Sequence, residues 1–195
     1  MGGPGDKKQL GKILLRQKLV SPGELDELLE HQREHPTSRL GSTAVESGKV
    51  EGVDMLRALS EQHGLPGIDL AQTVVPLSNL RLVPHDIARQ YLILPFSVKE
   101  EHLFLAMADP SDARVIDEIE FVTGRKVFPY VAISGALEQV IEVAYAQLDR
   151  GEEFYVGPHT PDAYLEELGL ERPASAPAAP RAPKRRPSSP RVRPP

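Results

Sequence analysis

The stretch that decides the fold is written twice in the chain: QLGKILLRQKLVSPGELDELLEHQ at residues 9–32, and RLGSTAVESGKVEGVDMLRALSEQ at residues 39–62. Every position in one copy lies 30 residues from its counterpart in the other. The identical pairs are Leu10/Leu40, Gly11/Gly41, Val20/Val50, Leu29/Leu59 and Gln32/Gln62. Because each copy of a fixed-period repeat is one supersecondary unit, two adjacent copies form a pseudo-symmetric surface. That surface suits a two-fold symmetric ligand or the face of a partner protein.

Each copy is expected to fold as a pair of helices joined by a turn. Apolar residues at helical spacing predict short helices at about 9–18 and about 39–47. The run Ser21-Pro22-Gly23-Glu24 provides an N-cap, a first-turn proline and a capping-box glutamate, so a helix begins there and ends before Pro36. Gly48 and Gly64 predict the ends of the third helix and of a fourth helix at about 52–63.

The apolar pattern changes its period in the second half of the chain. Residues 67–91 read as a connector with one short helix at about 80–90. Two apolar runs then flank the polar turn Lys99-Glu100-Glu101, which is typical of a β-hairpin. The hairpin is followed by a helix opened by Asp109-Pro110-Ser111-Asp112, a third strand at 126–132 and a last helix at 134–148. The order ββαβα predicts a compact subdomain whose sheet is covered on one face.

Charge divides the chain into an acidic body and a basic tail. The 195 residues carry a net charge of −5. Residues 171–195 contain eight prolines, seven Lys/Arg and one Glu, so they carry +6 and residues 1–170 carry −11. We expect the tail to be disordered, since it has too little apolar area to offset chain entropy. The acidic body argues against a broad nucleic-acid-binding face on the fold, because phosphate binding needs clustered Lys/Arg.

Missing features narrow the class of protein further. The chain has no cysteine, which excludes disulfides and thiolate metal sites. No stretch approaches the roughly 20 apolar residues of a membrane span, and the polar, glycine-rich N-terminus does not read as a signal peptide. We therefore expect a soluble, cytoplasmic protein.

The predicted fold class is α+β. A tandem helix-turn-helix of four short helices precedes a small ββαβα subdomain and a disordered Pro/Arg-rich tail. The predicted segments are a flexible lead (1–8), the tandem-motif helical subdomain (9–66), the connector (67–91), the α+β subdomain (92–150) and a largely disordered basic tail (151–195) with one further short helix at 161–169.

The doubled motif resembles a known family. The paired Gln/Arg-Leu-Gly…Gln pattern is similar to the MshEN domain, the N-terminal domain of type II secretion and type IV pilus assembly ATPases. The runs Leu105-Ala-Met-Ala-Asp-Pro-Ser-Asp112 and Thr123-Gly-Arg-Lys-Val127 look like the second half of that module, so the resemblance covers about residues 9–148. In that family the tandem motifs bind cyclic di-GMP in some members, and in others the domain docks the ATPase onto an inner-membrane partner. No G-x-x-x-x-G-K-[ST] motif occurs, so the resemblance is to the recognition module without its ATPase domain.

The resemblance implies a ligand that lies across both motifs. Cyclic di-GMP needs flat cations or apolar side chains for stacking, and donors for its phosphates and base edges. Arg39 supplies the planar cation, Gly41 permits close backbone approach and Gln62 suits a base edge. The expected ligand-binding residues are Gln9, Leu10, Gly11, Leu25, Leu29, Gln32, Arg39, Leu40, Gly41, Met55, Leu59, Gln62 and Asp109. No metal ligand, catalytic residue or resident cofactor is expected.

The first copy departs from the family pattern at two positions. Gln9 stands where the family has Arg and lacks the guanidinium plane. Lys18 stands where the second copy has Gly48, a glycine that we expect to need positive φ. Loss of half-site contacts weakens binding by about 1–3 kcal/mol, or roughly 5- to 150-fold.

Simpler roles compete for the same residues. The leucines are core candidates first, and Gln32 and Gln62 could equally serve as helix-end hydrogen bonders. Asp109 and Asp112 also suit a helix cap. His31 and His35 have metal-ligand spacing without convergent partners. The tail's Lys184-Arg185-Arg186 either binds an acidic partner, nucleic acid or anionic lipid, or only keeps the tail soluble.

Two functional hypotheses follow. The first is a non-catalytic cyclic di-GMP receptor or adaptor for secretion, pilus or motility machinery. The alternative is a degenerate module that has lost the nucleotide and acts only in protein–protein interaction. An enzyme is not expected, because no phosphate loop or nucleophile constellation is present.

Overall fold

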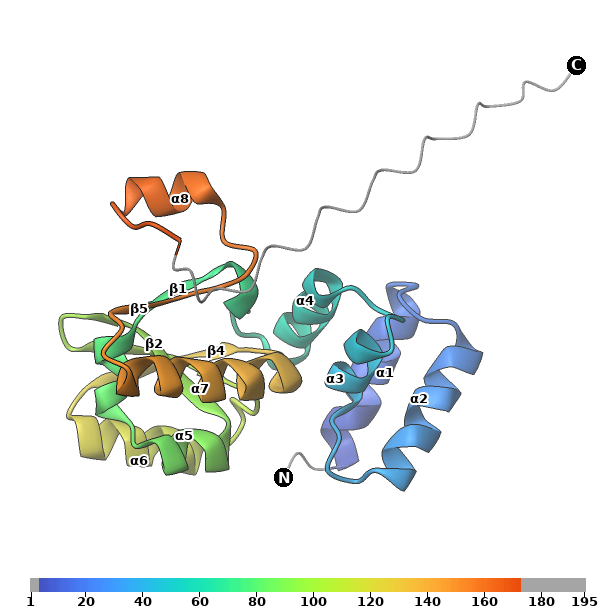
Figure 1. The fold of residues 1–195 in the computed structure, drawn as a ribbon. Helices are drawn as coiled ribbons and strands as arrows, with labels where there is room; N and C mark the ends of the chain where they lie inside the picture. The colour runs from blue at the N-terminus through green and yellow to red at the C-terminus, as the bar shows by residue number, and fades with distance from the viewer. Residues whose placement is uncertain (1–3, 173–195) are drawn as a thin grey trace, which may run out of the picture.

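The computed structural model describes the backbone of residues 4–172 and the side chains from Leu10 onward. Two subdomains lie side by side in Figure 1: four helices on one side, and small sheets with their covering helices on the other. The fold is α+β, as predicted. None of the described helices is long and apolar enough to cross a membrane. The predicted disorder of the tail beyond Arg172 lies outside the described residues.

The tandem motif folds as four helices, as predicted. They are α1 (Pro4–Arg16), α2 (Pro22–Glu34), α3 (Leu40–Glu46) and α4 (Gly52–His63). The predicted flexible lead over 1–8 is wrong from Pro4 onward, because α1 already begins there. Proline is favoured in the first turn of a helix, where its missing N–H has no partner to lose.

Matching local signals end or begin the helices in both copies. The predicted capping box is present: the Ser21 hydroxyl accepts from the Glu24 amide, and the Glu24 carboxylate accepts from the Ser21 amide at 2.8 Å. Lys18 and Gly48 both follow a helix in the left-handed conformation, with φ of 57° and 70°. The expected positive φ is therefore found in both copies, although only one has glycine.

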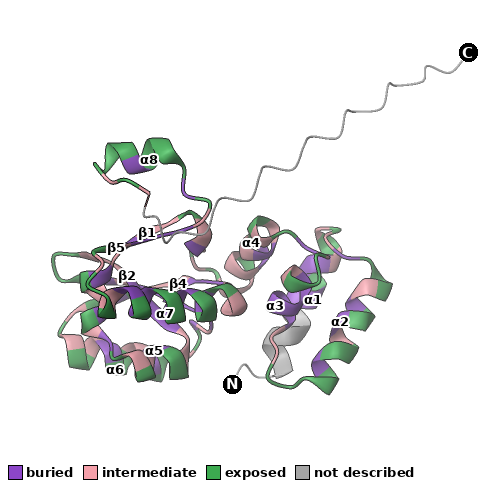
Figure 2. Ribbon diagram, in the orientation of Figure 1, coloured by how far each residue is buried: buried purple, intermediate pink, exposed green. Residues whose placement is uncertain are grey.

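A separate apolar core holds the four helices together, and Figure 2 shows its buried residues on their facing sides. Equivalent residues of the two copies meet in it. Its members are Leu10, Ile13, Leu14, Val20, Leu25, Leu28, Leu40, Ala44, Val50, Met55 and Ala58.

The second subdomain has the predicted ββαβα order. The hairpin β2 (Ile93–Lys99) and β3 (His102–Met107) is antiparallel, and β4 (Lys126–Val131) pairs parallel to β3 after helix α6 (Ala113–Thr123). Helix α7 (Ser134–Asp149) follows β4 directly. Buried Leu103 and Leu105 alternate with the more exposed His102 and Phe104, so one face of the sheet enters the core.

The open edge of β4 is protected against further strand pairing. The Val127 amide donates to the Glu120 carboxylate at 2.9 Å, and the Val131 amide donates to the Pro66 carbonyl at 2.9 Å. Pro129, at the position between them, has no amide hydrogen. Edge strands with no free donors do not template association with another chain.

The predicted connector over 67–91 and tail over 151–195 need correction. The connector contains the 3₁₀ turns η1 (Leu70–Gln72) and η2 (Leu77–Leu82), strand β1 (Val74–Pro76) and helix α5 (His85–Tyr91). Within the tail, β5 (Phe154–Val156) pairs antiparallel with β1, and helix α8 (Asp162–Glu167) lies inside the predicted 161–169. Each of these strands has three residues and is stabilised only by its distant partner, so neither gives a local signal.

Candidate functional site

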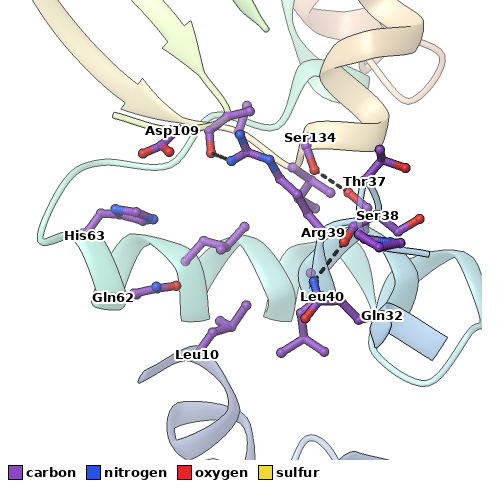
Figure 3. A pocket seen from close by; sticks show the side chains of 17 residues that line it. Leu10, Gln32, Thr37, Ser38, Arg39, Leu40, Gln62, His63, Asp109 and Ser134 are labelled. Atoms are coloured by element: carbon purple, nitrogen blue, oxygen red, sulfur yellow. Dashed lines mark hydrogen bonds between the residues drawn. The ribbon is translucent and has the colours of Figure 1, made fainter. Parts of the chain in front are cut away.

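A pocket of about 590 Å³ lies between the two subdomains. We call it the interdomain pocket. Its volume is within the range of small-molecule sites, and its lining is mostly apolar with a few polar groups. Figure 3 shows residues from helices α1, α3 and α4 facing loops of the sheet subdomain across it. The lining residues are Leu10, Gln32, Pro36, Thr37, Ser38, Arg39, Leu40, Gly41, Ser42, Leu59, Gln62, His63, Ala108, Asp109, Ala132, Ile133 and Ser134.

Eight of the residues singled out from the sequence line this pocket. They come from both copies of the motif and include two equivalent pairs, Leu10/Leu40 and Gln32/Gln62. The shared groove that the repeat predicted is therefore present. The eight are Leu10, Gln32, Arg39, Leu40, Gly41, Leu59, Gln62 and Asp109.

Four other predicted residues do not line the pocket. Leu25 and the fully buried Met55 belong to the helical core, and Leu29 packs against that core. A Cβ at Gly11 would lie 3.3 Å from Leu25, so this glycine permits close helix packing rather than ligand approach. The side chain of Gln9 lies outside the described residues.

Arg39 joins the helical subdomain to the sheet subdomain. It lies at the N-cap of α3, and its Nη1 donates to the Ala108 carbonyl at 2.7 Å (Figure 3). The lining of the pocket includes no Lys, and Arg39 is its one Arg. A guanidinium has five donors in a planar fork, so the group can hold Ala108 and still present donors to an anionic ligand.

The two repeat glutamines have different surroundings. Gln32 is 7% exposed, and its amide donates to the Ser38 carbonyl at 2.8 Å, which holds the loop between α2 and α3. Gln62 lies beside His63 on α4, on the other side of the pocket from Ser38 (Figure 3). Gln32 is therefore the helix-end hydrogen bonder that the sequence suggested, and it also forms part of the pocket wall.

The turn after β3 brings one carboxylate to the pocket. Asp109 lines it, is half-buried, and accepts from the Ser111 amide at 3.2 Å. Asp112 is the N-cap of α6, as the sequence suggested, and its hydrogen bond with Arg114 lowers the pKa of its carboxyl below the usual range. The two aspartates thus separate into a pocket residue and a cap.

A hydrogen-bonded serine pair, missed from the sequence, joins α3 to α7. The buried Ser42 hydroxyl accepts from the Gly135 amide at 2.8 Å and lies 2.6 Å from the Ser134 hydroxyl. Thr37, Ser38 and His63 were also missed. Isolated polar residues of this kind carry no sequence signal, because they line a common space only when the second subdomain packs against the helices.

The remaining candidates do not form a second polar centre. The rings of His31 and His35 lie 4.6 Å apart, and no group of three His, Asp or Glu suited to a metal occurs among the described residues. The lining of the interdomain pocket therefore combines apolar side chains with one guanidinium, two amides, one carboxylate, one imidazole and several hydroxyls. It offers both contact surface and hydrogen-bonding groups.

Comparison with known proteins agrees with this arrangement. The family model of the MshEN domain matches residues 63–151, which begin just past the doubled motif. The type IV pilus assembly ATPase PilB of Myxococcus xanthus is 32% identical over 149 residues, and that of Thermus thermophilus is 31% identical over 146 residues. These alignments cover 76% and 74% of the chain, but only 26% and 16% of the two ATPases.

The similarity extends to a solved structure. A structure of MshE with cdg (cyclic di-GMP) superposes with a TM-score of 0.53 and 26% identity, and covers 70% of the chain and 98% of MshE's solved chain. The regions matched in the two ATPases are therefore those of an N-terminal recognition domain rather than of a catalytic domain. Residues 63–151 therefore match the MshEN domain family, and the similarity to the fold of MshE extends over 70% of the chain.

Proposed function

We propose that the interdomain pocket binds cyclic di-GMP and that the chain acts as a non-catalytic receptor or adaptor for pilus or secretion machinery. The observation that supports this proposal most directly is that one pocket is lined by equivalent residues of both repeats, Leu10/Leu40 and Gln32/Gln62. A ligand with two-fold symmetry presents the same groups to both halves of such a pocket. MshE, a structural relative, was solved with this nucleotide.

The chemistry of the lining supports the same ligand. Half-buried Leu59 offers apolar surface for a guanine face, whereas Leu10 and Leu40, which are 5% and 3% exposed, reach the wall as members of the helical core. Arg39 offers donors and charge for a phosphate. Asp109 and Gln62 suit the donor and acceptor edge of guanine. Each of these groups lies on the pocket wall, on elements fixed by two separate cores.

The proposed site is asymmetric in its cations. Arg39 is the cation of the second copy, and Gln9 stands at the equivalent position of the first. We therefore expect one strong half-site, with binding weaker by roughly 5- to 150-fold than that of a pocket with two arginines. Gln9→Arg should recover affinity within that range.

Titration calorimetry with cyclic di-GMP tests the proposal. Arg39→Ala should weaken binding at least ten-fold, since it removes the one guanidinium in the lining. Arg57→Ala is the matched control, because Arg57 is an exposed arginine of α4 that pairs with Asp54 away from the pocket. Absence of heat at about 100 µM ligand, near 5.5 kcal/mol of binding free energy, would remove the receptor function.

One observation favours the alternative of a protein-only module. Gln32 and Arg39 already make hydrogen bonds to the Ser38 and Ala108 carbonyls, so the walls hold together without a nucleotide. In that case a pull-down should recover a pilus or secretion component equally with and without cyclic di-GMP. ATP turnover by the pure chain would contradict both functions.

A further inference from the structure

A second cavity of about 420 Å³ opens on the other side of the interdomain wall. Ser42, Ala132 and Ile133 line both spaces and separate them. We call the second space the acidic groove. It runs between α4, the η1 turn and the start of α7.

The groove has an apolar floor and an acidic rim. Leu70 is buried at the floor, Leu56 and Ile68 are half-buried, and Val53 at the lip is 51% exposed. Glu46, Glu51 and Asp69 contribute three carboxylates to the lining, which includes no Lys or Arg. An apolar floor open to solvent beside unneutralised carboxylates matches an occupant that is both apolar and cationic.

None of the three carboxylates forms an ion pair with a residue that the structure describes, and only Asp69 accepts hydrogen bonds from neutral donors. Asp69 accepts from the Ala71 amide and from the Gln72 side chain. Glu46 and Glu51, both exposed, make no ion pair with any residue that the structure describes, and Glu51 does not cap α4 with its side chain. These two charges are therefore available to a cationic segment.

The chain contains such a segment. Residues 173–195 carry six Lys/Arg and no acid, a charge of +6, against −11 for residues 1–172. Pro177, Pro180 and Pro183 recur every third residue, the spacing at which a polyproline II helix presents one apolar face. Lys184-Arg185-Arg186 follow immediately. Prolines on the floor and cations at the rim would match the groove in both respects.

The point where this segment begins lies next to the groove. Arg172 donates to the Thr160 carbonyl and pairs with Asp162 at 2.8 Å. His159, directly before Thr160, lines the groove, and its amide donates to the Ala71 carbonyl at 2.7 Å. The cations at 181–186 lie 9 to 14 residues further on, within a reach of about 28–43 Å at 3.1 Å per residue.

From these observations we propose that the acidic groove is the docking site of the chain's own segment 173–195. The prolines cover the apolar floor, and the cations pair with Glu46 and Glu51. The inference does not depend on the ligand of the interdomain pocket.

Intramolecular disulfide formation in the full chain tests this docking. The chain has no cysteine, so Val53→Cys with Ala182→Cys creates one defined pair. We expect it to close at least ten times faster than the control pair Val122→Cys with Ala182→Cys. Val122 is an exposed valine of α6 outside the groove, at 65% exposure. Mild oxidation followed by non-reducing electrophoresis measures both rates.

Removing or screening the groove's negative charge provides a second test of the docking. Glu46→Gln with Glu51→Gln should lower the Val53/Ala182 rate toward that of the control pair, as should 1 M salt, where the Debye length is about 3 Å. Circular dichroism checks that the variants stay folded. Equal rates for the two pairs, or a rate unchanged by both charge neutralisation and salt, would overturn the proposal. Cross-linked dimers in place of the internal disulfide would assign the groove to a second copy's tail and overturn it as well.

Discussion

Replacing Lys18 with glycine should stabilise the protein. Lys18 closes α1 in the left-handed conformation with φ of 57°, and Gly48 closes α3 with φ of 70°. Both ends have the same pair of hydrogen bonds: Lys18 and Leu19 donate to the Leu15 and Leu14 carbonyls, as Gly48 and Lys49 donate to Val45 and Ala44. The two helix ends thus differ in residue type but not in geometry.

The magnitude follows from the backbone alone. A left-handed residue other than glycine costs about 1–2 kcal/mol, and glycine loses about 0.5–1 kcal/mol more chain entropy on folding. Lys18→Gly should therefore gain about 0.5–1 kcal/mol. A Cβ at Gly48 would meet nothing within 4 Å, so Gly48→Ala should lose a similar amount without any steric clash. Lys18 is exposed, so no packing is lost.

Urea unfolding followed by circular dichroism measures both changes. At a slope of roughly 2 kcal/mol/M, Lys18→Gly should raise the midpoint by about 0.3–0.5 M at unchanged slope, and Gly48→Ala should lower it by a similar amount. The melting temperature should move by about 1–4 °C in the same directions. The reasoning would be refuted if Gly48→Ala lowered the free energy of unfolding while Lys18→Gly left it unchanged or lowered it. That result would mean that Lys18 stabilises its turn by some other contact.

Three further changes test the contacts that hold the subdomains and strands together. Ser42→Ala removes two hydrogen bonds to the start of α7 and should cost about 1–2 kcal/mol of unfolding free energy in urea. Gly157→Ala would place a Cβ 2.4 Å from the Ala71 carbonyl oxygen and should cost about 1–3 kcal/mol, whereas the control Gly23→Ala, with open space around it, should cost nothing. Burial, and then the nearby Asp69 charge, raise the pKa of Tyr155 to about 12. Because this folded pKa exceeds the unfolded value near 10, the contribution of Tyr155 to stability is intact below pH 10 and is lost as the pH rises toward 12. In a pH series of melting temperatures, Tyr155→Phe should therefore reduce the loss of stability at alkaline pH.

Much of the helical subdomain could be predicted because its signals are local. The capping box at Ser21 and the glycine ends at Gly48 and Gly64 act within a few residues of the chain, and all three are present in the structure. The repeat also predicted that both copies would share one groove. The start of α1 at Pro4 was missed, since the polar N-terminal residues have no apolar periodicity to mark a helix.

The candidate site could be predicted only in part. Repeat symmetry identified Gln32, Arg39 and Gln62, because equivalent positions of two packed units face a common space. It could not separate pocket from core: Met55 and Leu25 have the same spacing as pocket residues, yet turn inward. Which side of a short amphipathic helix meets solvent depends on the neighbouring helices, and the sequence does not place them.

The sequence by itself determined the order and type of the main elements, the acidic body with its basic tail, and the doubled motif that forms two similar helical units. Only the tertiary structure decided the β1–β5 pairing, the Ser42 contact with the start of α7, and the walls of both cavities. The physical reason is the separation along the chain of the residues that make each contact. Helix caps and hairpins are stabilised by neighbours in the chain. These features instead join residues some 70 to 120 positions apart, and their meeting depends on the packing of the whole fold.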